Sequence, residues 1–402
     1  MKILMLGWEL PPHNSGGMGV ACYQMCEALS SMGVSIEFVV PYEAEHGIPF
    51  MQVTAAQPLK ADDVRLIMGI YDSKYFISDG NTENWLSSME VEARYVKAVE
   101  KIAVESSFDV IHAHDWLTCR AALRAKELSG KPLIVHIHAL EADRAGKPGA
   151  GNSLVREIEY LALTLADRIV AVSERTKQLI MSEYDVPADK INVIHNSIDA
   201  SALQPLDPDN AYRYLEQMKN DGYKVVANIG RFTLQKNIPN LLHSFRAVVD
   251  KLPKTILLLV GNGDQFQELI HMSATLGLSK NVIFTDFQRG KNVRDGFAIA
   301  DLFVMPSVSE PFGLTPLEAI GYGTPSLISY QSGVAEVLKN CLKVDFWDTR
   351  EMANQIVGAL ENPALLEEMR VQAKNELEHL TWDNSARKLI DTYRLHLGSV
   401  LT

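Results

Sequence analysis

Cysteine, positive charge and long apolar runs are all scarce in this sequence. Four cysteines occur among 402 residues. No His/Cys set at zinc spacing accompanies Cys22 and Cys26, so we interpret them as core thiols rather than metal ligands. No run reaches the roughly 20 apolar residues of a membrane span, which argues against stable membrane insertion. Fifty acidic against 38 basic residues give a net charge of −12, which disfavours nonspecific binding to nucleic acid or to an anionic membrane.

Repeats and low-complexity segments are also missing, and we expect no signal peptide. The opening MKILMLGW is predicted to be a buried strand, because its apolar run is short and Glu9 and two prolines follow at once. We therefore expect a cytoplasmic protein. The 47% of hydrophobic and 22% of charged residues are typical of a folded chain. The length predicts two or three domains of roughly 150 residues each.

Strand and helix patterns alternate along both halves of the chain. The first half has predicted strands at 3–6, 34–40, 109–112, 133–137, 168–172 and 190–194, and predicted helices at 18–31, 117–128 and 154–166. The second half has predicted strands at 225–229, 256–260, 282–284, 302–305 and 325–328, helices at 238–251 and 264–276, a further element at 293–300, a helix through Glu318, and two or three more helices from Arg350 onward. This order predicts an α/β fold of two Rossmann-like, doubly wound domains with parallel strands and crossover helices.

The domain boundary is predicted near Leu206. After His195 the segment NSIDASALQPLDPDN breaks both periodicities and is typical of a linker. We predict domains over 1–200 and 223–380, a linker over 201–222 and a C-terminal helix over 381–402. Between 43 and 105 the pattern is weaker, and we interpret this segment as an excursion that shapes a substrate cleft. Its mixed polar and aromatic residues include Tyr71, Tyr75, Phe76 and Trp85.

The stretch 307–324, SVSEPFGLTPLEAIGYGT, is the most informative part of the chain. Its residues Thr315 to Glu318 have the form of a capping box, which predicts a helix with Thr315 as its N-cap. The N–H groups of Gly313, Leu314 and Thr315 would then lie at a helix N-terminus on the carboxyl edge of a parallel sheet. Such a place favours a phosphate.

Two carboxylates flank this predicted phosphate site, Glu310 and Glu318. Carboxylates beside a phosphate suit uncharged groups such as the hydroxyls of a sugar and of a ribose, a combination that indicates a nucleotide sugar. In the alternative interpretation, Glu318 only caps the helix and Glu310 is solvated.

Two cations follow the first predicted strand of the second half, Arg231 and Lys236. An arginine fork grips a diphosphate through two bonds, and a lysine adds a point charge. A solvated charged face is the alternative. The turn Gly261-Asn262-Gly263 follows the next strand and is of the kind that approaches a nucleotide.

A glycine-rich loop, Ser15 to Gly19, joins the first strand to the first helix, where backbone N–H groups can approach a phosphate. A dinucleotide site would need an acidic residue at the end of the second strand, and Glu37 lies mid-strand instead, so nicotinamide binding is disfavoured.

Four histidines end two strands of the first half: His112, His114, His136 and His138. Alternation makes the two histidines of each strand point the same way, so they could enter a cleft. They could also ligate a metal, although no carboxylate partner at helical spacing supports that alternative.

Together these motifs resemble the retaining GT-B glycosyltransferases of glycosyltransferase family 4, the group that includes glycogen synthase. The resemblance covers nearly the whole chain. It rests on WELPPHNSGGMG, HAHDW, RIVAVSERTKQLI, VIHNSID, NIGRFTLQKN and EPFGLTPLEAIGYGTP. It implies two domains facing across a cleft, with the helix of LTWDNSARKLIDTYR crossing back to the first domain and Trp382 at the hinge.

The resemblance also implies roles for single residues. Arg231 and Lys236 would neutralise the donor diphosphate without a metal, Glu310 would bind the transferred sugar, and Glu318 the ribose. Phosphate and nucleotide contacts would come from Gly16, Gly17, Asn262, Gly313, Leu314 and Thr315. His114 would lie under the sugar near the reacting carbon, and Glu9 and His138 would face the acceptor side.

The implied activity is transfer of a hexose, with glucose preferred, from a nucleoside-diphosphate sugar to a sugar or glucan hydroxyl with retained configuration. The expected partners are that donor and a carbohydrate acceptor, with no cofactor, metal or nucleic acid. Alternatives are a nucleotide-sugar 2-epimerase, a noncatalytic carbohydrate- or nucleotide-binding protein, and a peripheral membrane transferase with a lipid-linked acceptor. Bacterial glycogen synthases carry a lysine where this chain has Asn14, which argues against an ADP-glucose glucan synthase.

Overall fold

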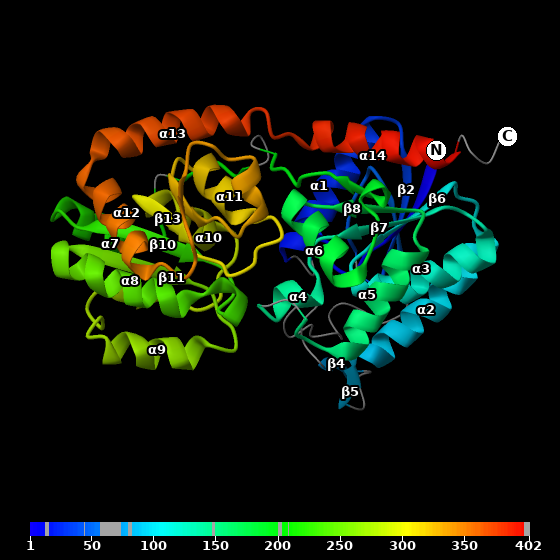
Figure 1. The fold of residues 1–402 in the computed structure, drawn as a ribbon, viewed down its shortest axis with the longest axis horizontal. Helices are drawn as coiled ribbons and strands as arrows, with labels where there is room; N and C mark the ends of the chain where they lie inside the picture. Colours follow the sequence, from blue (N-terminus) through cyan, green and yellow to red (C-terminus); the bar gives the residue numbers. More distant parts are fainter. Residues whose placement is uncertain are drawn as a thin grey trace. The chain divides into compact units, whose positions relative to one another are not determined.

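The computed structural model describes residues 1–12, 16–43, 45–56, 74–78, 83–146, 149–199, 203–207 and 209–397 (Figure 1). Asn14, Ser15 and Tyr71 lie outside the described residues, as do the side chains of Tyr75, Phe76 and Trp85. The chain divides into two compact units. Unit 1 comprises Met1–Glu141, Gly151–Ser197 and Trp382–Thr402, and unit 2 comprises Ala142–Ala150 and Ile198–Thr381.

Unit 1 is built on a seven-stranded sheet in the order β3-β2-β1-β6-β7-β8-β9, with every pair parallel. The strands are β1 (Lys2–Leu6), β2 (Ser35–Val40), β3 (Gln52–Ala55), β6 (Val110–His114), β7 (Leu133–Ile137), β8 (Arg168–Ala171) and β9 (Ile191–Val193). The helices are α1 (Gly17–Ser31), α2 (Ser88–Glu105), α3 (Trp116–Ser129), α4 (Glu141–Arg144), α5 (Ser153–Leu165), α6 (Glu174–Tyr184) and α14 (Trp382–Leu397); β4 (Lys74–Ser78) and β5 (Glu83–Ser87) form a separate hairpin.

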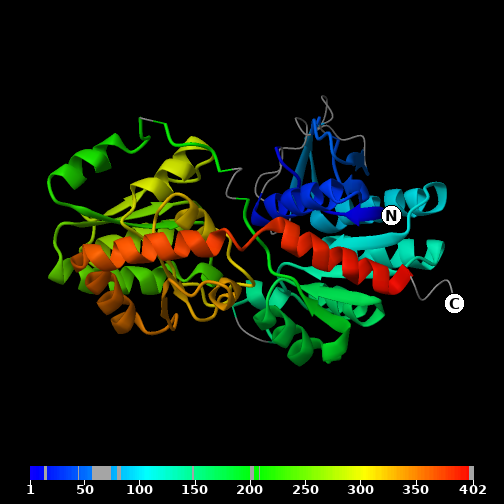
Figure 2. The same ribbon diagram turned by 90° about the horizontal axis from the view of Figure 1, so that it is seen from above.

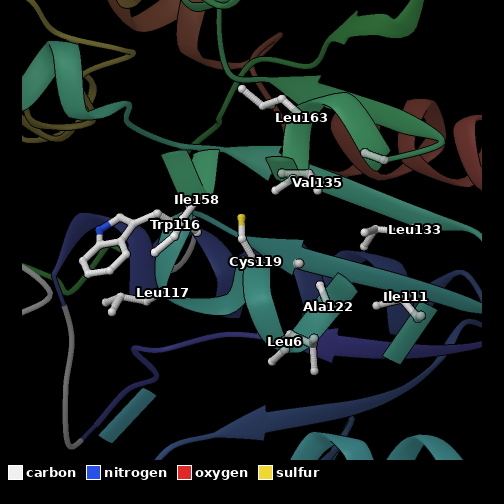
Figure 3. Close-up of a cluster of buried hydrophobic side chains, with 14 of the residues drawn as sticks. Leu6, Ile111, Trp116, Leu117, Cys119, Ala122, Leu133, Val135, Ile158 and Leu163 are labelled. Carbon is white, nitrogen blue, oxygen red and sulfur yellow. The ribbon is translucent and has the colours of Figure 1, made fainter. Parts of the chain in front are cut away.

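The core of unit 1 lies between this sheet and its helices. Strands β6 and β7 are buried along their whole length, as expected for parallel strands that helices cover on both faces. Figure 3 shows Cys119 of α3 among strand side chains such as Ile111 and Val135, with Ile158 of α5 beside it. The Cys119 thiol therefore acts as a small apolar group, and burial raises its pKa well above the ordinary value.

Helix α14 packs on α1 (Figure 2). The Trp382 indole Nε1 donates to Gln24 Oε1 at 2.7 Å, and the Tyr393 hydroxyl lies 2.6 Å from Nδ1 of His112 on β6. The predicted return of the C-terminal helix to the first domain is confirmed.

Unit 2 is built on a six-stranded sheet in the order β12-β11-β10-β13-β14-β15, again with every pair parallel. The strands are β10 (Lys224–Ile229), β11 (Thr255–Val260), β12 (Val282–Phe284), β13 (Leu302–Met305), β14 (Ser326–Ser329) and β15 (Leu342–Val344). The helices are α7 (Arg213–Asn220), α8 (Ile238–Lys251), α9 (Phe266–Thr275), α10 (Lys291–Ile299), α11 (Thr315–Gly321), α12 (Thr349–Glu361) and α13 (Pro363–Leu377). The predicted α/β class with two Rossmann-like parallel sheets is confirmed.

Helix α2 is absent from the sequence-based prediction, which treated 43–105 as a weak pattern. Val91, Tyr95 and Val99 are buried at a spacing of four residues, so they form one apolar stripe on the helix. Acidic and basic residues between them hid this period. Among the described residues, no helix is both long and apolar enough to cross a membrane.

Candidate active site

Glu310 lies in the loop between β13 and α11 and is buried. Its backbone N–H donates to the Gln331 carbonyl at 3.0 Å, and its carbonyl accepts from Gly333 N–H at 2.9 Å. The Ser307 hydroxyl donates to Glu310 Oε2 at 3.0 Å. The carboxylate is therefore held at the carboxyl edge of the sheet, where open α/β sheets bind ligands.

Lys236 reaches this carboxylate from the loop after β10, the strand beside β13. Its Nζ forms an ion pair with Glu310 Oε2, and both side chains are largely buried. The neighbouring Gln235 fastens the two loops, because its Nε2 donates to the Ser309 carbonyl at 2.7 Å. The structure thus pairs Lys236, one of the two predicted cations, with the Glu310 carboxylate. Arg231, the other predicted cation, is exposed and lies two residues beyond the end of β10.

Helix α11 begins at Thr315 as predicted, but the capping box is wrong. Leu314 is the N-cap, it makes no side-chain cap, and the Thr315 hydroxyl lies 3.6 Å from Met305 Sδ instead. Gly313 adopts a φ of 99°, a conformation that favours glycine. Among the described residues, no acceptor is recorded for the N–H groups of Gly313, Leu314 and Thr315.

Glu318 does not cap the helix; it lies in the first turns of α11 and is partly buried. Burial raises the pKa of this carboxyl from 4.5 to about 7, because desolvation disfavours the charged form. A carboxyl that changes charge near neutral pH at a sheet edge is typical of a functional site.

The turn Gly261-Asn262-Gly263 requires its two glycines because its backbone touches the backbone of the neighbouring loop. A Cβ on Gly261 would lie 1.8 Å from the Gly230 carbonyl oxygen, and one on Gly263 would lie 2.3 Å from the Phe232 carbonyl oxygen. The Asn262 side chain donates to Asp286 Oδ1 at 2.6 Å. These glycines let the loops after β10 and β11 pack backbone to backbone.

In unit 1, the four predicted histidines form one cluster, with two on β6, one on β7 and His138 directly after β7. Nδ1 of His114 lies 3.0 Å from Nε2 of His138, and Nε2 of His112 lies 3.2 Å from Nδ1 of His136. The rings of His112 and His114 stack with centroids 4.6 Å apart, and those of His136 and His138 with centroids 4.4 Å apart.

Burial keeps this histidine cluster uncharged at neutral pH. Desolvation lowers the pKa of His112, His114 and His136 well below the ordinary value, and it lowers the pKa of His138 to about 4. Nε2 of His136 and Nδ1 of His138 are buried and have no hydrogen-bond partner among the described residues. Neutral imidazole is the form that can accept a proton or bind a metal.

Two overlapping sets in this region have metal-ligand chemistry: Cys22, His114 and His138, and His112, His114 and His136. Within each set the ligand atoms lie within 4.8 Å of one another. His114 belongs to both, so one ion would occupy one set at a time. The predicted absence of a metal stays a prediction.

Glu9 reaches the N-terminus of α1. Its Oε2 accepts from Gly16 N–H at 3.0 Å and from Gly19 N–H at 3.4 Å, and a Cβ on Gly16 would lie 2.7 Å from this atom. The carboxylate thus occupies N–H groups of the glycine-rich loop that we predicted to contact phosphate. Gly17 is the first residue of α1.

Asp143 is a residue near the site that the sequence analysis missed. It is buried, and its Oδ1 accepts from the Ser309 hydroxyl at 2.5 Å, next to Glu310. It belongs to the segment Ala142–Ala150, which groups with unit 2 although its sequence neighbours group with unit 1. No local sequence pattern predicts that a segment inside unit 1 groups with unit 2.

Two solved structures with a similar fold span nearly the whole chain. Sucrose-phosphate synthase from Thermosynechococcus elongatus superposes with a TM-score of 0.77 at 19% identity, covering 99% of each chain. The Anabaena protein Alr3699/HepE, solved with UDP and glucose, superposes with a TM-score of 0.72 at 19% identity, covering 98% of this chain and 99% of the other. These two superpositions show that the chain has a GT-B fold.

Sequence comparison gives the family. Residues 15–202 match the model of Glycosyltransferase Family 4, and residues 216–376 match that of Glycosyl transferases group 1. An uncharacterized glycosyltransferase of Methanocaldococcus jannaschii is 27% identical, with 98% of each chain covered. Glycogen synthase of Mycobacterium tuberculosis is 25% identical, with 98% of this chain and 94% of that protein covered. This chain belongs to the glycosyltransferase family 4 group that includes glycogen synthase.

Proposed function

We propose that this glycosyltransferase moves a hexose, with glucose preferred, from a nucleoside-diphosphate sugar to a carbohydrate hydroxyl with retained configuration. The observation that carries the proposal is the ion pair between Lys236 and Glu310 at the carboxyl edge of the unit 2 sheet. Glycogen synthase among the relatives, and Alr3699/HepE solved with UDP-glucose, support this donor class.

In the proposed reaction, the bond between the anomeric carbon and the diphosphate oxygen breaks while the acceptor oxygen bonds to the same face of that carbon. The acceptor proton passes to the leaving phosphate oxygen. Lys236 and Arg231 compensate the charge that develops on the diphosphate, and Glu310 accepts hydrogen bonds from sugar hydroxyls. Glu318, in its ionised form, accepts from the ribose.

A thermal-shift panel tests the donor. ADP, UDP, GDP and their glucose esters are added to the protein with and without magnesium. We expect one base to raise the melting temperature, with equal effect when magnesium is omitted, because fixed cations take the place of the metal. If no nucleotide shifts the melting temperature, the proposal is wrong.

The stereochemistry is tested with the donor that the panel identifies. Proton NMR of the transfer product should show the α-anomeric configuration of the donor glucose at the new glycosidic bond. An inverted product would contradict retention. A changed sugar in the absence of any acceptor would instead support the epimerase alternative.

A further inference from the structure

Two aromatic side chains on unit 2 are exposed beside the candidate donor site. Trp347 is 59% exposed and Tyr330 is 58% exposed. Tryptophan is mostly buried in folded proteins, and Trp8, Trp116 and Trp382 of this chain are at most 7% exposed. An open indole on this unit therefore needs an explanation.

Both aromatic residues lie on the carboxyl edge of the sheet. Tyr330 directly follows β14, and Trp347 lies three residues beyond the end of β15, the neighbouring parallel strand. The Tyr330 N–H donates to the Val344 carbonyl at 2.9 Å, which extends the pairing of the two strands. The Trp347 ring stands edge-on against Phe346, with centroids 4.8 Å apart and an interplanar angle of 84°.

The loops that carry these two rings are fixed by side-chain hydrogen bonds. Gln331 donates through Nε2 to Asp345 Oδ1 at 2.8 Å and accepts through Oε1 from Phe346 N–H at 3.3 Å. The Phe346 carbonyl accepts from Asn237 at 2.9 Å and from Asn240 at 3.2 Å. The backbone that carries the two rings is therefore ordered before a ligand binds, which lowers the entropic cost of binding.

The same hydrogen bonds continue into the candidate donor site. The Gln331 carbonyl accepts from the Glu310 N–H at 3.0 Å, and Asn237 directly follows Lys236. Tyr330 and Trp347 therefore lie on loops that are hydrogen-bonded to the segments carrying Glu310 and Lys236.

We propose that Tyr330 and Trp347 form a carbohydrate-stacking platform for an oligosaccharide acceptor. The platform binds hexose units of this acceptor that do not themselves react. An aromatic face packs against the apolar face of a hexose, while neighbouring polar groups such as Gln331 and Asp345 suit its hydroxyls. A protein partner would need about 800 Å² of complementary surface, and two rings separated by polar residues are too small a patch for that. The proposal rests on the proposed function and specifies its acceptor as a chain of hexoses.

Isothermal titration calorimetry tests the platform, with glucose, maltoheptaose, cellohexaose and laminarihexaose as probes. We expect at least one oligosaccharide to bind more tightly than glucose. Trp347→Ala should weaken that binding about fivefold to tenfold, the loss of one aromatic contact, and Trp347→Phe should restore most of it. Tyr330→Ala should also weaken it. Tyr160→Ala, which removes a 50% exposed ring on α5 of unit 1, should leave it unchanged.

The platform is overturned if no oligosaccharide binds more tightly than glucose, or if Trp347→Ala binds it as well as the unaltered protein does. The nucleotide thermal shift, measured on the same samples, separates this failure from failure of the proposed function. If the nucleotide still shifts the melting temperature but the platform fails its test, the proposed transferase activity holds and its acceptor is a different one. Loss of both overturns the proposed function as well.

Discussion

Among single residues, Lys236 carries the sharpest prediction. Lys236→Ala removes a positive charge and leaves the Glu310 carboxylate unpaired where the diphosphate is proposed to bind. We expect transfer to fall by about a hundredfold, measured as kcat/KM for the nucleotide sugar. Lys219→Ala is the matched control, since Lys219 Nζ pairs with Asp301 at 3.1 Å at similar burial elsewhere in unit 2. An equal loss in both variants would mean that folding, rather than the site, is affected.

The raised pKa of Glu318 predicts how the free energy of unfolding depends on pH. Its pKa is about 7 in the folded protein against an ordinary value of 4.5, so the folded state binds the proton more tightly than the unfolded chain does. The contribution of the protonated Glu318 carboxyl to the free energy of unfolding is fully present below pH 4.5. It is lost as the pH rises through about 7. Glu318→Gln should therefore gain about 1 to 3 kcal/mol relative to the unaltered protein between about pH 5 and about pH 8.

Urea unfolding at the two pH values checks this gain. Glu361→Gln is the control, because Glu361 is exposed at the end of α12. If the two substitutions change stability in parallel across this range, the Glu318 carboxyl is not titrating as its burial requires.

Residue identities predicted which groups meet at the site better than they predicted local geometry. Strand-end positions placed Lys236 and Glu310 at the same sheet edge, because parallel strands share that edge. The motif at Thr315 predicted a capping box, yet its hydroxyl turns to Met305. A capping pattern fixes a helix start but not the side-chain rotamer, which the packing of Met305 decides here.

At the scale of elements, the loops after β10 and β11 depend on their glycines. Gly261 has a φ of 147°, and an added Cβ would lie 1.8 Å from the Gly230 carbonyl oxygen. Gly261→Ala should therefore destabilise the protein by about 3 kcal/mol or more. Gly358→Ala in α12 meets nothing within 4 Å and should stabilise it by up to about 1 kcal/mol. Thermal unfolding of both variants checks the prediction; equal melting temperatures would contradict it.

The alternation of strands and helices was predictable because each element carries its own period. Helix α2 was missed although Val91, Tyr95 and Val99 hold a four-residue period, because charged residues between them dominate the composition. The grouping of Ala142–Ala150 with unit 2 could not be predicted from the sequence. It involves a contact between Asp143 and Ser309, which lie far apart along the chain.

For the whole molecule, the division into two units has a thermodynamic consequence. Each unit has its own parallel sheet and its own buried cluster, and multidomain proteins commonly unfold in more than one step. The chain crosses between the units more than once, since α14 returns to unit 1. Side chains of α14 should therefore stabilise unit 1, and a nucleotide should stabilise unit 2.

Differential scanning calorimetry separates these two effects. Trp382→Ala removes a side chain that is 6% exposed and costs about 3 to 5 kcal/mol, so it should lower one transition by roughly 10 °C. Leu395→Ala, on the same helix but 63% exposed, should leave that transition in place. The nucleoside diphosphate at about 100 times its Kd adds about 2.7 kcal/mol and should raise the other transition alone. If the nucleotide and the Trp382 substitution instead move one shared transition, the two units unfold as a single cooperative body.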